Sequence, residues 1–205
     1  TITSRALVVG NGWDQPRNNR VRYDTPTISG FTLSASWGED DFSDVALRYA
    51  GTLGDFKAKA AIGYTWDDDD NAVAAGETNA LIISAGIMHT PTGLFLHGMY
   101  ADYSFDGVRV DSDSWMVQAG IQQRWNELGK TTLFGAYQEA DDGLATLVAG
   151  QSSKQERLSF GIIQDIDAAA MKISLVYEHL ENEVSTEALG LQDIDTIRVT
   201  GVILF

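Results

Sequence analysis

The feature that most constrains this chain is an alternation of apolar and polar residues that recurs in short segments along nearly its whole length. Successive side chains of a β-strand point to opposite faces, so a period of two residues indicates strands with two unlike faces. Proline is scarce, at 3 residues in 205, and no amphipathic helical period competes. The pattern predicts eleven strands, at residues 18–25, 31–38, 44–51, 55–66, 79–90, 94–104, 113–125, 131–140, 155–166, 171–180 and 195–205.

The connections between the predicted strands alternate between two kinds as far as the C-terminus. One kind is short and has the composition of tight turns: TPTISG at 25–30, TLGD at 52–55, TPTG at 90–93, NELGK at 126–130 and DAAA at 167–170. The other kind is mostly longer and acidic, at 67–78, 105–112, 140–154 and 181–194. A soluble β-sandwich mixes loop lengths at both ends, whereas an outer-membrane barrel has short periplasmic turns and long extracellular loops. The alternation favours the barrel.

Each predicted strand has one apolar face. In the last segment Ile197, Val199 and Phe205 share one face, while Arg198 and Thr200 lie on the other. A water-soluble barrel would turn its apolar faces inward, and for an isolated strand that is the more ordinary arrangement. Arginines that recur on the polar faces, and aromatic residues near strand ends, instead favour a water-filled lumen and interfacial girdles. The sequence therefore predicts an all-β, antiparallel transmembrane β-barrel.

Composition excludes several classes of function. The formal net charge is −15, so the basic surface that nucleic-acid binding requires is not expected. Cysteine is absent, which removes thiol catalysis and cysteine-ligated zinc. No serine stands in a nucleophile-elbow context and no glycine-rich phosphate-binding motif occurs, so we expect neither an enzyme nor a cofactor. No apolar run approaches the ~20 residues that a membrane-spanning helix needs.

Two segments resemble the general porin family, the trimeric, sixteen-stranded diffusion pores of Gram-negative bacteria. Residues 19–26 (NRVRYDTP), followed by 28–31 (ISGF), are similar to the sixth strand of the family, its turn and the start of the seventh. The C-terminal strand that ends in Phe205 resembles the signal by which outer-membrane proteins are recognised for assembly. The resemblance implies a homotrimer in the outer membrane, in contact with its lipid and lipopolysaccharide, that passes small hydrophilic solutes and ions.

The resemblance also implies that this chain lacks the first five strands of the family. An antiparallel single-chain barrel closes with an even number of strands, and eleven strands cannot close in that way. Residues 18–205 then supply the last eleven strands of sixteen, and residues 1–17 correspond to the end of the inward-folded third loop. An alternative makes Ile2–Val9 a first strand of a complete twelve-stranded barrel, which would act as a structural or adhesive surface protein or as a hydrolase.

The basic residues form the candidate site. Strand alternation places nine of them on lumen-facing positions: Arg20, Arg22, Arg48, Lys57, Lys59, Arg124, Arg157, Lys172 and Arg198. Charges that line a narrow, low-dielectric passage set ion preference without a binding step. Arg22 matches the sixth-strand arginine of the porin family, which implies a place at the channel constriction. Arg20 and Arg48 are further candidates for the constriction.

The remaining charges suggest no metal centre. The run Asp67–Asp70 has two interpretations. It is either a solvated loop or a site that binds calcium or bridges lipopolysaccharide through divalent cations, since hard cations prefer carboxylate oxygen. The solvated loop is favoured. Phe205 is expected to act in assembly rather than in transport.

Overall fold

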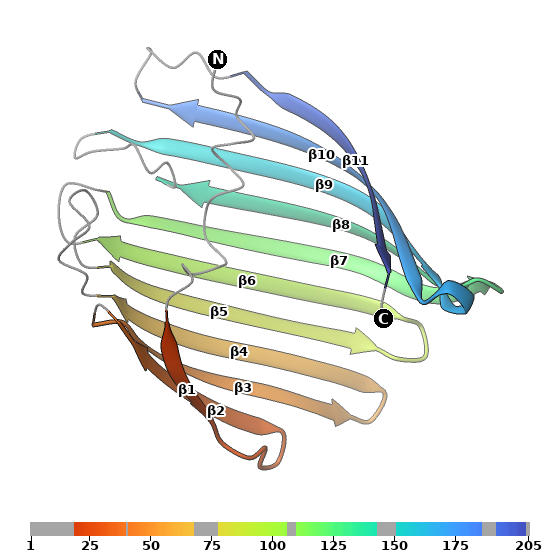
Figure 1. Cartoon of the computed structure of the whole chain (residues 1–205). Coiled ribbons are helices and arrows are strands. Elements are labelled where there is room, and N and C mark those ends of the chain that lie inside the picture. The colour runs from red at the N-terminus through yellow and green to blue at the C-terminus, as the bar shows by residue number, and fades with distance from the viewer. Residues whose placement is uncertain are drawn as a thin grey trace.

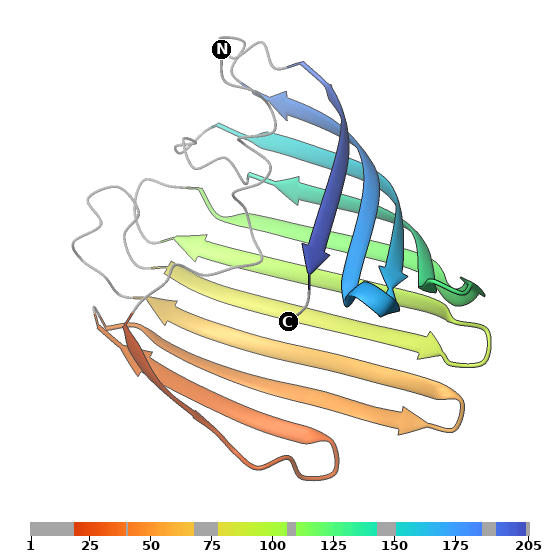
Figure 2. The same ribbon diagram turned by 45° about the vertical axis from the view of Figure 1, so that its right-hand side comes forward.

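The computed structural model describes residues 19–39, 41–67, 78–105, 110–142, 151–185 and 192–203. Within these residues it contains one antiparallel sheet in which each strand pairs with its neighbours in sequence. The strands are β1 (Arg20–Asp24), β2 (Phe31–Gly38), β3 (Ser43–Leu53), β4 (Phe56–Asp67), β5 (Thr78–His89), β6 (Leu94–Phe105), β7 (Ser112–Asn126), β8 (Gly129–Asp141), β9 (Ser153–Ile166), β10 (Met171–Val184) and β11 (Ile194–Ile203). The sheet curves into an open barrel wall, with β1 and β11 at its two edges (Figures 1 and 2).

The predicted strands are confirmed to within a few residues at each end. The largest difference is at β10, which continues four residues past the predicted end because its ladder with β9 extends to the pair Val184 and Ser153. Within the described residues, no helix is long and apolar enough to cross a membrane. The expectations for residues 1–17, for Ile2–Val9 and for Phe205 concern residues outside those that the structure describes.

The short connections all lie at one rim of the wall, as the sequence predicts (Figure 1). Glycine supplies the backbone conformation that several of them need: Gly54, for example, has φ +57° and Gly93 has φ +71°, a region that side chains disfavour. At Gly93 a Cβ atom would also overlap the carbonyl oxygen of Gln122 on β7. The connection after β9 forms a short 3₁₀ turn, Asp167–Ala169. Tight turns hold neighbouring strands in a fixed register, which fixes the face of every side chain.

The polarity of the wall is the reverse of that of a soluble protein. Large apolar side chains of the outer face are exposed, including Phe160 at 53% and Ile197 at 75%. Buried side chains of the inner face include the small polar residues Ser34 and Ser36, each 1% exposed. In water such an outer surface would forfeit the free energy of apolar burial, whereas in a bilayer it meets hydrocarbon. The outer face of the sheet is therefore suited to contact with membrane lipid.

The outer face changes from apolar to acidic toward the long-loop rim. Three outward tyrosine hydroxyls mark the boundary by donating to carboxylates: Tyr100 to Asp102 at 3.4 Å, Tyr137 to Glu156 at 2.6 Å and Tyr177 to Asp195 at 2.6 Å. Rings with an apolar body and a polar end are enriched at membrane interfaces. We call the outward carboxylates beyond these rings the acidic belt: Asp102, Asp113, Glu139, Asp141, Glu156, Glu181, Glu183 and Asp195.

Candidate functional site

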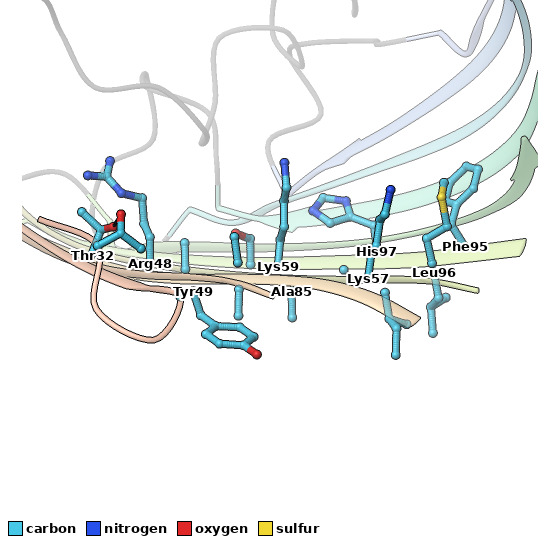
Figure 3. A pocket seen from close by; sticks show the side chains of 18 residues that line it. Thr32, Arg48, Tyr49, Lys57, Lys59, Ala85, Phe95, Leu96 and His97 are labelled. Carbon is cyan, nitrogen blue, oxygen red and sulfur yellow. Dashed lines mark hydrogen bonds between the residues drawn. The ribbon is translucent and has the colours of Figure 1, made fainter. Parts of the chain in front are cut away.

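The inner wall of β3 to β6 carries a group of basic and polar side chains. Arg48, Lys57, Lys59 and His97 point to the same side of the sheet, into the concave lumen, while Tyr49 points away from it (Figure 3). The alternation of each strand produces this arrangement, because Ala50 of β3 pairs with Lys59, and Thr52 with Lys57. The result is a row of nitrogen-bearing side chains on an inner wall that also carries small residues and, toward the short rim, Met88 and Phe95.

Two arginines share one carboxylate on this wall. Arg22 Nη2 lies 2.8 Å from Asp24 Oδ1, and Arg48 Nη2 lies 2.5 Å from the same oxygen. The Ser34 hydroxyl donates to Asp24 and accepts from Arg48. These residues belong to β1, β2 and β3, and the register brings them to one height, since Asp24 pairs with Ser34. Two guanidinium groups against one carboxylate leave a net positive cluster that faces the lumen.

Arg20 forms a separate, locally neutral pair. Its Nη1 lies 2.9 Å from Asp44 Oδ2, and the Ser36 hydroxyl donates to the same oxygen at 2.5 Å. Its guanidinium also lies 5.7 Å from the centre of the Phe42 ring. Arg20 is thus held by its own counter-ion, whereas Arg22 and Arg48 divide one counter-ion between them. The field of Arg20 in the lumen is correspondingly weaker.

Lys57 and Lys59 differ from the arginines. Among the described residues neither lysine has an acidic partner within ion-pair distance. They project from neighbouring inward positions of β4. An ammonium group on a flexible stem stays hydrated and acts as a point charge. This part of the wall therefore offers positive charge to the lumen without a fixed counter-ion from the described chain.

A second charged cluster lies on the far part of the inner wall, on β9 to β11. Glu178 is buried and lies between two arginines, at 3.9 Å from Arg157 and 3.6 Å from Arg198. Arg157 also donates to the side-chain oxygen of Gln138 on β8. Here, as at Asp24, two guanidinium groups face one carboxylate, so the imbalance of positive over negative charge recurs on the inner wall.

The structure supports the predicted inward positions of the basic residues by strand alternation, with one difference. Arg124 lies at the short rim, where the register of β7 shifts between Gln123 and Asn126, and it pairs with Asp167 at 2.7 Å. Sequence reasoning did not find the specific partners Asp44 and Glu178. Their inward parity was available from the pattern, but the register that pairs them with arginines was not. The constriction role of Arg20, Arg22 and Arg48 stays a prediction.

An antiparallel wall with a lipid-compatible outer face, an aromatic boundary and a charged inner face defines the class of outer-membrane β-barrel proteins. A family model described as Gram-negative porin matches residues 2–192 of the chain. The chain belongs to this family, and its place is the outer membrane of a Gram-negative bacterium. No curated protein sequence matches it.

Solved outer-membrane proteins share the fold. OccK10 of Pseudomonas aeruginosa superposes with a TM-score of 0.63 at 16% identity, over 91% of this chain and 60% of that one. A BenF-like porin of Pseudomonas fluorescens gives 0.60 at 13% identity, over 82% and 49%. OmpT of Vibrio cholerae gives 0.55 at 13% identity, over 89% and 62%. The chain thus spans about half to three fifths of the length of these structures.

Proposed function

We propose that the chain forms part of a water-filled channel through which small hydrophilic solutes and ions diffuse passively across the outer membrane. The observation that carries the proposal is the inverted polarity of the wall, with exposed apolar side chains outside and charged or hydroxyl side chains inside. Such an inner face keeps water in the lumen, because its charged and hydroxyl side chains offer hydrogen-bonding partners. Transport of this kind needs no catalytic step and no cofactor.

The proposal assigns the cluster of Arg22, Asp24 and Arg48 to the narrow part of the channel. Its unbalanced positive charge lies on a thin wall backed by lipid, where the field is focused into the lumen. Together with Lys57 and Lys59 it favours anions and the negative ends of dipolar solutes. Arg20 lies on the same face as a weaker contributor, because Asp44 neutralises it.

Closure of the barrel requires strands beyond the eleven that the structure describes. In an antiparallel sheet of eleven strands β1 and β11 run in the same direction, so only an odd number of additional strands can pair with both edges in antiparallel fashion. A second copy of the chain in the same orientation would pair its β1 with β11 of the first copy in parallel, whereas every other pair in this sheet is antiparallel. We propose five further strands of the same protein, which give the sixteen of the resembling porins. We also propose the trimeric assembly of that family.

The direct test is conductance of the full-length protein in a planar lipid bilayer. We expect large, stable single-channel steps that grow with salt concentration, because bulk-like electrolyte fills the lumen. A surface protein that is only structural or adhesive, or an outer-membrane hydrolase with a filled barrel, would give little or no conductance. Folded protein that inserts but shows no steps would refute the proposed channel.

A further inference from the structure

His179 occupies an unusual place on the outer face of the wall. It lies on β10 with Leu175 and Tyr177, which face outward, whereas Glu178 and Leu180 face inward and are buried. His179 is the next outward residue after Tyr177 in the direction of the long-loop rim, so it lies among the carboxylates of the acidic belt. The channel proposed above makes no use of this residue, because it lies on the other side of the wall from the lumen.

Both ring nitrogens of His179 face carboxylates. Nδ1 lies 2.8 Å from Asp195 Oδ1, and Nε2 lies 2.9 Å from Glu181 Oε1. A neutral imidazole carries only one N–H group, so it can donate to only one of these two oxygens. The other contact would then set a nitrogen lone pair against a carboxylate. The arrangement is complete only when a cation is added, either a second proton on the ring or a metal ion.

The carboxylates around His179 are placed as a ligand set. One ligand atom each from His179, Glu181 and Asp193 lie within 4.8 Å of one another. Asp195 faces the other ring nitrogen, so it accepts from the Nδ1–H group and orients the imidazole when an ion is bound on the Glu181 side. The Tyr177 hydroxyl donates to the same Asp195 oxygen at 2.6 Å and holds that carboxylate in place. Metal–nitrogen and metal–oxygen bonds of zinc are about 2.0–2.2 Å long, so the three side chains must move closer together to share one ion. The exposed positions of Glu181 and Asp193 leave them free to do so.

We propose that His179, Glu181 and Asp193, with Asp195 beside them, form a surface site for a divalent transition-metal ion of the zinc class. The imidazole is what selects this class, because nitrogen ligands suit zinc, copper and nickel, while calcium and magnesium prefer oxygen alone. Elsewhere on the belt carboxylates gather without a histidine, as at Asp102, Asp113 and Asp141. A bound ion would join β10 to the start of β11 beside the long-loop rim.

The test is calorimetric titration of Zn²⁺ into the folded, full-length protein in detergent micelles. We expect one zinc site per chain that loses about tenfold or more in affinity in His179→Ala. Glu181→Gln should weaken it as well. Asp113→Asn, which removes one charge from the same belt, and His89→Ala, which removes an imidazole from the opposite rim, should leave zinc affinity unchanged. Heat-shift electrophoresis confirms that each variant is folded before titration.

Cu²⁺ supplies a second measurement that does not depend on affinity. Its paramagnetic resonance spectrum should show coupling to a ring nitrogen in the parent protein and in Asp113→Asn, and should lose that coupling in His179→Ala. Zinc affinity that is the same in His179→Ala as in the parent would overturn the proposal. Equal binding of Zn²⁺ and Ca²⁺, with no nitrogen coupling, would do so too, because it would reduce the site to a diffuse acidic surface.

Discussion

Arginine in place of Leu96 should prevent most of the protein from folding into a bilayer, whereas arginine in place of the adjacent His97 should leave folding nearly intact. Leu96 is 52% exposed on the outer face and pairs with Ala119 of β7, well inside the apolar band. An arginine at the membrane midplane costs about 2–4 kcal/mol on the lipid face of a barrel. That cost shifts a folding equilibrium by a factor of roughly thirty to several hundred.

His97 is the matched control because it differs from Leu96 by one step of the strand. Its ring points into the lumen, on the same side of the sheet as Lys57 and Lys59 (Figure 3), where a further charge remains in water. The fraction folded into lipid vesicles can be measured by heat-shift electrophoresis across a urea titration. If Leu96→Arg folds as well as His97→Arg, the assignment of the two faces is wrong.

Replacing Arg22 by glutamate should move the ion preference of the channel toward cations. The change turns a net positive cluster, two arginines around Asp24, into a net negative one at the same place on the wall. We expect a several-fold shift in the anion-to-cation permeability ratio, obtained from the reversal potential across a salt gradient. The shift should be largest in dilute salt and small near 1 M, because the Debye length falls from ~10 Å at 0.1 M to ~3 Å there.

Arg124→Glu is the control for Arg22→Glu, since it makes the same change of charge at the short rim, where Arg124 pairs with Asp167. We expect a smaller shift in reversal potential from it. Both variants should fold, because each position is solvated. Equal effects of the two variants, or no effect of Arg22→Glu in dilute salt, would show that the Arg22 cluster does not lie at the narrow part of the channel.

The period of the sequence was enough to predict the strands and their faces. Alternation needs no knowledge of neighbours, so the outward position of Leu96 and the inward positions of Arg22 and Arg48 follow from the pattern alone. The assignment of short connections to one rim and long ones to the other followed from connection length, which is also read directly from the sequence. A short turn restricts the chain to a hairpin, and glycine at positions such as Gly93 identifies it.

Pairing between strands could not be predicted in the same way. Arg48 meets Asp24, 24 residues away, only because two turns set the registers of β1, β2 and β3. A slip of one residue would move one partner to the other face. Asp113, Glu156 and Asp195 lie within the predicted strands, but the pattern did not indicate that the strand registers gather them into one acidic belt on the outer face. The surroundings of His179 were therefore not foreseen.

Single cysteines along β4 test the central claim of a water-filled lumen most directly. The chain contains no cysteine, so each substitution, made in a full-length background without other cysteines, adds one thiol. The inward positions are Lys57, Lys59 and Ala61, and the outward positions are Ala58, Ala60 and Ile62.

The measurement is single-channel conductance before and after a negatively charged, membrane-impermeant thiol reagent is added. We expect the reagent to lower the conductance at the inward positions and to leave it unchanged at the outward ones, because only the inward thiols meet water. Reaction at the outward positions, or no alternation along the strand, would contradict the account of this wall as the side of a water-filled pore.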